Sequence, residues 1–147
     1  MVFSIRAIIE VIGYPESHVN EVTQKVGERL AAESGIIISK QNISKADKVK
    51  DTIHASMIEV ELKINDYPKL LHFCYDYLPS TIEILDTDKI AIPIREFTNG
   101  LNDLIAKLHQ YNLTVTSLMD KINNKKPKEY KINEASPEDE LDLTKEN

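Results

Sequence analysis

Residues 97–122 read FTNGLNDLIAKLHQYNLTVTSLMDKI, and this stretch has the strongest periodic pattern in the chain. Apolar residues recur along it at alternating intervals of four and three: Phe97, Leu101, Leu104, Leu108, Tyr111, Val115, Leu118 and Ile122. A repeat of 3.5 residues keeps one narrow apolar stripe along a helix, as in helices that pair with one another. Such a helix would be about 40 Å long. Because a small domain cannot cover that length, we expect these eight residues to form the interface of a homodimer or higher oligomer.

The same spacing has a second interpretation. A single helix that packs across a sheet also places apolar residues three and four apart. Gly100, Asn112 and the β-branched run 114–116 lower the helix propensity of the stretch. The pattern therefore leaves open whether the helix continues past Asn112.

The part of the chain before this helix alternates between strand-like and helix-like patterns. Residues 53–64, IHASMIEVELKI, give the clearest strand, since apolar and charged residues alternate along its second half. The predicted strands are 2–12, a second that begins at 36–38, 53–64 and 81–85. The second strand continues as an edge strand and runs into a loop by residue 50. The predicted helices are 16–33 and one that begins with an Asn65-Asp66 cap and Pro68 and ends at Pro79. This β-α-β-β-α-β order predicts an α+β, ferredoxin-like sandwich with two helices on one face of an antiparallel sheet.

The prediction divides the chain into three parts. Residues 1–93 form the ferredoxin-like domain, residues 94–123 form the long C-terminal helix, and residues 124–147 form a polar tail that ends acidic. The tail has too few apolar residues to offset its chain entropy, so we expect it to be disordered.

Composition excludes several classes of function. The 147 residues carry a formal net charge of −6, which argues against general binding to nucleic acid or to an anionic membrane. No apolar run is long enough to span a membrane. Cys74 is the single cysteine, so the chain forms no intramolecular disulfide and a reducing cytoplasm is the expected setting.

No cluster of residues amounts to a catalytic or metal centre, so we expect neither an enzyme nor a cofactor. His72 and Asp76 are only two potential metal ligands and are better explained as a hydrogen-bonded pair. Cys74 falls on the apolar side of its helix and is expected to be structural. Residues 86–88, DTD, resemble the start of a calcium loop, but the glycine and terminal glutamate of such a loop are missing.

The richest polar and aromatic cluster surrounds Tyr75 and Asp76. With Tyr77, Ser80 and Glu83 these residues could line a ligand pocket where the second helix meets the last strand. The alternative is that Tyr77 belongs to the core while Tyr75 and Asp76 form a solvated rim.

The first 40 residues resemble an ACT-type ligand-sensing domain. The resemblance rests on the strand IIEVIG at 8–13, the turn Gly13-Tyr14-Pro15, the helix that ends at Leu30, and the run 35–38, GIII. The acidic residue that this family usually carries before the turn is missing here. The resemblance implies side-by-side dimers and a small effector, such as an amino acid, near Gly13, Tyr14 and Asn20. The sequence thus predicts a self-associating, non-enzymatic interaction module, with an ACT-like sensor as the alternative.

Overall fold

The structure is a computed structural model that describes residues 2–85 and 88–125. The chain separates into two compact units, Met1–Gln110 and Tyr111–Asn147, and each is described by itself. The predicted tail lies almost wholly outside the described residues, as does most of the DTD sequence.

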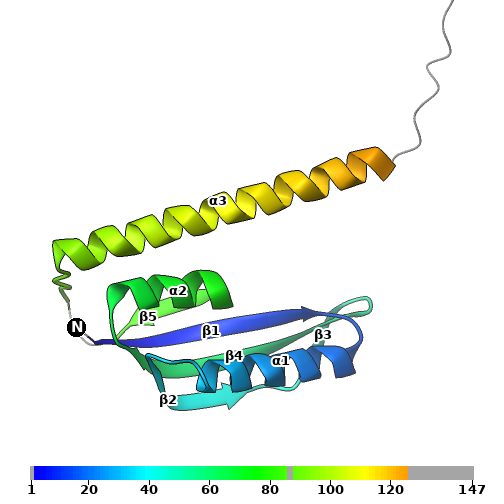
Figure 1. Cartoon of the computed structure of the whole chain (residues 1–147). Coiled ribbons are helices and arrows are strands. Elements are labelled where there is room, and N and C mark those ends of the chain that lie inside the picture. The colour runs from blue at the N-terminus through cyan, green and yellow to red at the C-terminus, as the bar shows by residue number, and fades with distance from the viewer. Residues whose placement is uncertain (1, 86–87, 126–147) are drawn as a thin grey trace, which may run out of the picture. The chain divides into compact units, whose positions relative to one another are not determined.

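The elements follow one another in an alternating order (Figure 1). They are β1 (Phe3–Gly13), α1 (Glu16–Ala31), β2 (Ile36–Ile43), β3 (Asp47–Lys50), β4 (Ile53–Ile64), α2 (Tyr67–Tyr77), β5 (Thr81–Ile84) and α3 (Ile94–Lys125).

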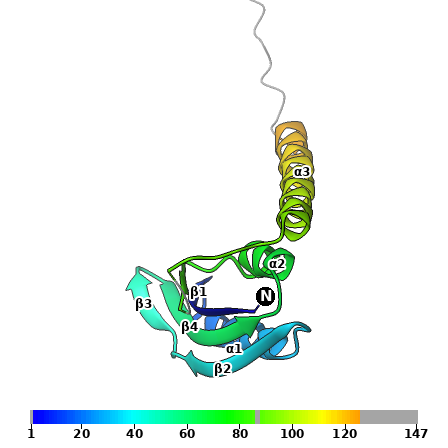
Figure 2. The ribbon, with the colours of Figure 1, turned by 90° about the vertical axis from the view of Figure 1, so that its left-hand side faces the viewer.

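All strand pairs are antiparallel, and the sheet has the order β2-β4-β1-β5, with β3 paired to β4 (Figures 1 and 2). Helices α1 and α2 each connect two strands that are not neighbours, and this split βαβ arrangement defines the ferredoxin-like topology. The predicted α+β fold is confirmed. The polar run 39–50 is divided differently, however, because β2 extends to Ile43 and β3 forms an additional short strand.

Strand periodicity places the core on one face of the sheet. In β1 the side chains of Phe3, Ile5, Ala7 and Ile9 are buried, whereas the residues between them are more exposed. The buried face packs against Leu30 of α1 and against Leu70 and Phe73 of α2. Both helices therefore cover the same face, and the opposite face carries charged pairs such as Arg6 with Glu61 and Glu83.

Local sequence signals fix the start of α2. The Asp66 carboxylate accepts a hydrogen bond from the Lys69 amide at 2.8 Å, and a proline occupies the first turn. This is the predicted cap, because an N-cap carboxylate satisfies an amide that has no partner within the helix.

Helix α3 runs without interruption from Ile94 to Lys125 and so passes Asn112. It ends two residues beyond the predicted boundary at 123. None of the described helices combines the length and the apolar character needed to cross a lipid bilayer.

Candidate functional site on helices α2 and α3

The first half of α3 packs closely on α2 at a glycine. Gly100 is the one buried residue that α3 contributes among the described residues, and a Cβ atom built on it would lie 2.7 Å from Cε1 of Tyr67. The Tyr67 ring also stacks on Phe97, with the ring centroids 5.3 Å apart. The absence of a side chain at position 100 therefore lets the two helices approach.

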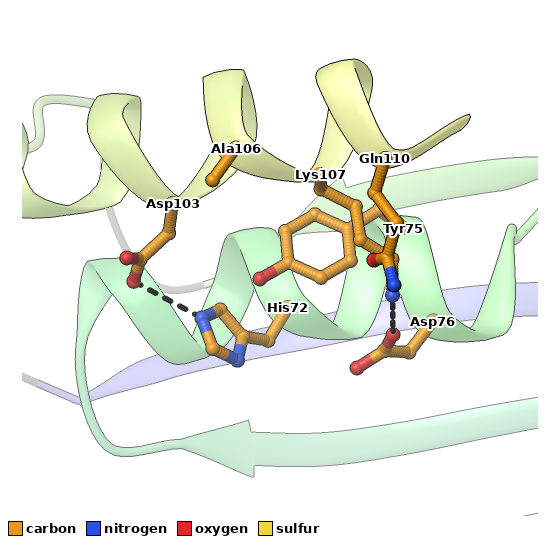
Figure 3. Close-up of a pocket in the computed structure, with 7 residues that line it drawn as sticks. All are labelled: His72, Tyr75, Asp76, Asp103, Ala106, Lys107 and Gln110. Atoms are coloured by element: carbon orange, nitrogen blue, oxygen red, sulfur yellow. Dashed lines mark hydrogen bonds and ion pairs between the residues drawn. The ribbon is translucent and has the colours of Figure 1, made fainter. Parts of the chain in front are cut away.

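Two polar contacts extend this packing along the helices (Figure 3). The imidazole Nε2 of His72 lies 3.1 Å from the Asp103 carboxylate, and the Lys107 ammonium lies 3.3 Å from the Asp76 carboxylate. Between them the ring of Tyr75 lies 5.0 Å from the His72 ring and 5.3 Å from the Lys107 nitrogen. Together with Ala106 and Gln110, these residues line an open groove of about 390 Å³.

The contacts with α2 combine Phe97 and Gly100 with polar groups of α3. Gly100, Asp103 and Lys107 are three and four residues apart and so lie on one side of the helix. The apolar stripe lies beside this contact and is covered only in part: Phe97 stacks on Tyr67 and Leu104 is half-buried, whereas Leu101 is 38% exposed and Leu108 is 55% exposed. In this unit α3 thus places Phe97, Gly100 and polar groups against α2 and leaves Leu101 and Leu108 largely in solvent.

The second unit contains the remainder of the helix, and its apolar residues are also exposed. Four of them continue the 3.5-residue repeat: Tyr111, Val115, Leu118 and Ile122. Met119 lies beside the repeat, whereas Leu113, which is 71% exposed, lies on another side of the helix.

Tyr75 and Asp76 line the groove with α3 rather than a pocket against β5. Tyr77 is buried and its hydroxyl donates to Glu33 at 3.0 Å, in agreement with its assignment to the core. Ser80 instead donates to the Ile8 carbonyl, and Glu83 pairs with Arg6 on the opposite face of the sheet.

The expected pair between His72 and Asp76 is replaced by contacts of each residue with α3. The sequence carried a signal for this arrangement: His72 and Asp76 are four residues apart, as are Asp103 and Lys107. Equal spacing of complementary groups allows two aligned contacts between helices. The sequence alone does not show that these two helices are neighbours, however, so this match of spacings does not stand out from other possible matches.

The residues of the ACT-type resemblance lie elsewhere in the first unit. Asn20 accepts a hydrogen bond from the Ala46 amide at 2.8 Å and so holds the loop after β2. It also lines a hollow of about 500 Å³ with Glu16, Gln24 and Lys45. Gly13 ends β1 and Tyr14 is 63% exposed, and neither lines this hollow.

Cys74 is half-buried on α2, and burial raises the pKa of its thiol. A raised pKa lowers the thiolate fraction, so this cysteine is poorly suited to nucleophilic chemistry. Among residues 2–85 and 88–125, no three histidine, cysteine or carboxylate side chains lie close enough to share a metal ion.

Fold and site together define an α+β protein of ferredoxin-like topology whose C-terminal helix packs on α2 through Phe97, Gly100 and two polar contacts. The chain belongs to the MJ0538 family, because the model of that family matches residues 4–146. Comparisons with curated proteins and with solved structures gave no match.

Proposed function

We propose that this protein is a non-enzymatic interaction module that pairs with a second copy of itself through the apolar stripe of α3. The observation that supports the proposal most directly is the division of α3 into two sides. One side contacts α2 through Gly100 and polar groups, and most of the apolar stripe, which has the 3.5-residue repeat of pairing helices, is exposed to solvent. Two stripe residues are partly covered: Phe97 stacks on Tyr67, and Leu104 is half-buried.

The energetics of pairing favour this use of the stripe. Burying a leucine or valine side chain contributes about 1.5–3 kcal/mol. The six aliphatic positions of the stripe can together offset an association cost of about 4–15 kcal/mol. A second copy is a suitable partner because two identical stripes share the same repeat, so that each side chain meets a complementary gap.

The test is the mass of the full chain in solution. The double variant Leu108→Glu with Leu118→Glu places a charge in the stripe of each unit, at positions that are 55% and 52% exposed, so folding should be retained. We expect the unmodified chain to sediment as a dimer or larger species and the double variant as a monomer.

Leu113→Glu is the matched control, since Leu113 is more exposed but lies outside the repeat. It should leave the mass unchanged. A monomeric unmodified chain, or equal loss of assembly in the control, would contradict pairing through the stripe.

A second candidate function is an ACT-like sensor of a small molecule such as an amino acid. It is favoured by the hollow of about 500 Å³ beside Asn20, which lies within the region that the resemblance implies. Preferential binding to the folded state would raise the melting temperature. A panel of amino acids should then stabilise the chain, and Asn20→Ala should abolish the shift; no shift with any member would remove this candidate.

The proposal also includes a cytoplasmic location, which is supported by the single cysteine. Fractionation of cells that express the full chain would test it.

A further inference from the structure

The sheet has an unfilled edge next to β1. β1 pairs with β4 from Phe3 to Gly13, but β5 pairs with it only from Ile5 to Ile8 (Figure 1). The second half of β1 therefore has no strand of the described residues on that side. Edges of this kind present main-chain donors and acceptors that can pair with another segment.

The direction of the main-chain groups follows from the observed hydrogen bonds. The Ser4 carbonyl accepts from Leu85 at 2.9 Å and the Ile8 carbonyl accepts from Ser80 at 2.8 Å, so the even-numbered residues of β1 face β5. By strand alternation, the amide and carbonyl groups of Glu10 and Ile12 face the same side, beyond the end of β5. The odd-numbered residues face β4.

A small hollow lies at this edge. Its volume is about 230 Å³, and its lining includes Val11 of β1, Val26 and Arg29 of α1 and Tyr77 of α2, together with the acidic residues Glu10 and Asp76. Small-molecule pockets commonly measure about 300–1,000 Å³. The hollow is therefore better suited to one or two apolar side chains of an added strand than to a cofactor.

One segment of the chain has the pattern that this edge requires. Residues 128–133 read KEYKIN, so Tyr130 and Ile132 would share one face of a strand and Lys131 would lie on the other. With the apolar pair in the hollow, Lys131 would lie on the face that carries the Glu10 side chain. The other alternating segment, LDL at 141–143, would place Asp142 beside Glu10, which is unfavourable.

We propose that residues 128–133 of a second copy add as a short strand to the open edge of β1 at Glu10–Gly13. The inference rests on the proposed pairing of copies, which raises the local concentration of each tail at its partner. The family match supports a role for this segment because it extends to residue 146. The segment has few apolar residues, but strand addition relies on main-chain hydrogen bonds to an existing edge.

Hydrogen exchange on the assembled full chain tests the inference at single amides. The amides of Glu10 and Ile12 should exchange slowly, nearly as slowly as those of Ile9 and Val11, which face β4 in every case. In Tyr130→Asp with Ile132→Asp, exchange at Glu10 and Ile12 should accelerate at least tenfold, while Ile9 and Val11 and the assembled mass stay unchanged.

Leu141→Asp with Leu143→Asp is the matched control and should leave all four amides unchanged. In the monomeric Leu108→Glu, Leu118→Glu variant, the amides of Glu10 and Ile12 should exchange rapidly. Rapid exchange of these two amides in the assembled unmodified chain overturns strand addition, and protection that persists in the monomer overturns the second copy as its source. An unchanged mass of the stripe variant instead overturns the proposed pairing, so the two failures are distinguishable.

Discussion

Gly100 shows how a single residue decides where α3 lies in the first unit. In most helices a change from glycine to alanine is stabilising by about 1 kcal/mol. Here the added methyl group would lie 2.7 Å and 2.8 Å from two ring atoms of Tyr67. At this position alanine therefore has two opposite effects on the free energy of unfolding: a higher helix propensity raises it, and the steric clash between α2 and α3 lowers it.

We expect Gly100→Ala to be destabilising by about 1–3 kcal/mol, because overpacking of a close contact outweighs the propensity gain. Urea denaturation of the full chain would measure the change. Asn102→Ala, at an exposed position of the same helix, should be neutral or slightly stabilising. A stabilised Gly100→Ala variant would show that the contact with Tyr67 relaxes freely.

Glu33 gives the domain a defined response to acid. Hydrogen bonds from Lys69 at 2.6 Å and from the Tyr77 hydroxyl at 3.0 Å hold the pKa of its carboxyl below the usual value. Burial, together with Glu33, raises the pKa of Tyr77 to about 12. The ionised carboxylate and the neutral phenol are thus the favoured forms of this pair.

A lowered folded-state pKa stabilises the domain above the unfolded-state pKa of Glu33, and this contribution is lost as the pH falls below about 4.5 through the folded-state pKa. We therefore expect Glu33→Gln to melt at a lower temperature than the unmodified chain at neutral pH and to lose less stability between pH 4.5 and pH 3. Thermal melts across that range would measure how the melting temperature of each chain changes with pH. Glu28→Gln, on the exposed side of α1, should retain the full acid response.

At the scale of elements, the polar contacts between α2 and α3 orient the helix more than they stabilise it. The side chains of His72 and Asp103 are 39% and 48% exposed, so solvent screens their attraction. Exposed pairs of this kind contribute about 0.2–1 kcal/mol. The stacked Tyr67 and Phe97 rings and the close approach at the buried Gly100 therefore carry more of the contact.

A double-mutant cycle of His72→Ala and Asp103→Ala should therefore give a coupling free energy below about 1 kcal/mol. Urea titrations of the two single variants, the double variant and the unmodified chain supply the four values. A coupling of several kcal/mol would mean that the pair is the main link between the helices.

The elements that the sequence predicts are those with a strong periodic pattern. β1 and β4 alternate clearly, and α2 has both a cap and an apolar side, so their positions follow from local rules. β3 was missed because DKVK has a single apolar residue and is held mainly by its main chain against β4. The groove between α2 and α3 depends on which helices become neighbours, and local patterns do not carry that information. Tyr75 and Asp76 were therefore identified as candidates, but their partners on α3 were not.

At the scale of the whole molecule, pairing through α3 couples stability to concentration. If only folded chains pair, the melting temperature of the unmodified chain should rise with protein concentration by mass action. The Leu108→Glu, Leu118→Glu variant should melt at a temperature that does not depend on concentration. Melts at concentrations a hundredfold apart would separate the two behaviours, and an equal response in both chains would argue against linkage through the stripe.

The order of strands in the sheet also has a consequence for biosynthesis. β1 is the first element to be made, yet both of its neighbours, β4 and β5, come later in the chain than α1 and β2. The nascent chain therefore carries an isoleucine-rich segment without its hydrogen-bonding partner until residues 53–64 have left the ribosome. Fragments that end before Ile64 lack the strand that covers β1 along its full length, and they are expected to be captured by chaperones or to aggregate rather than to accumulate in folded form.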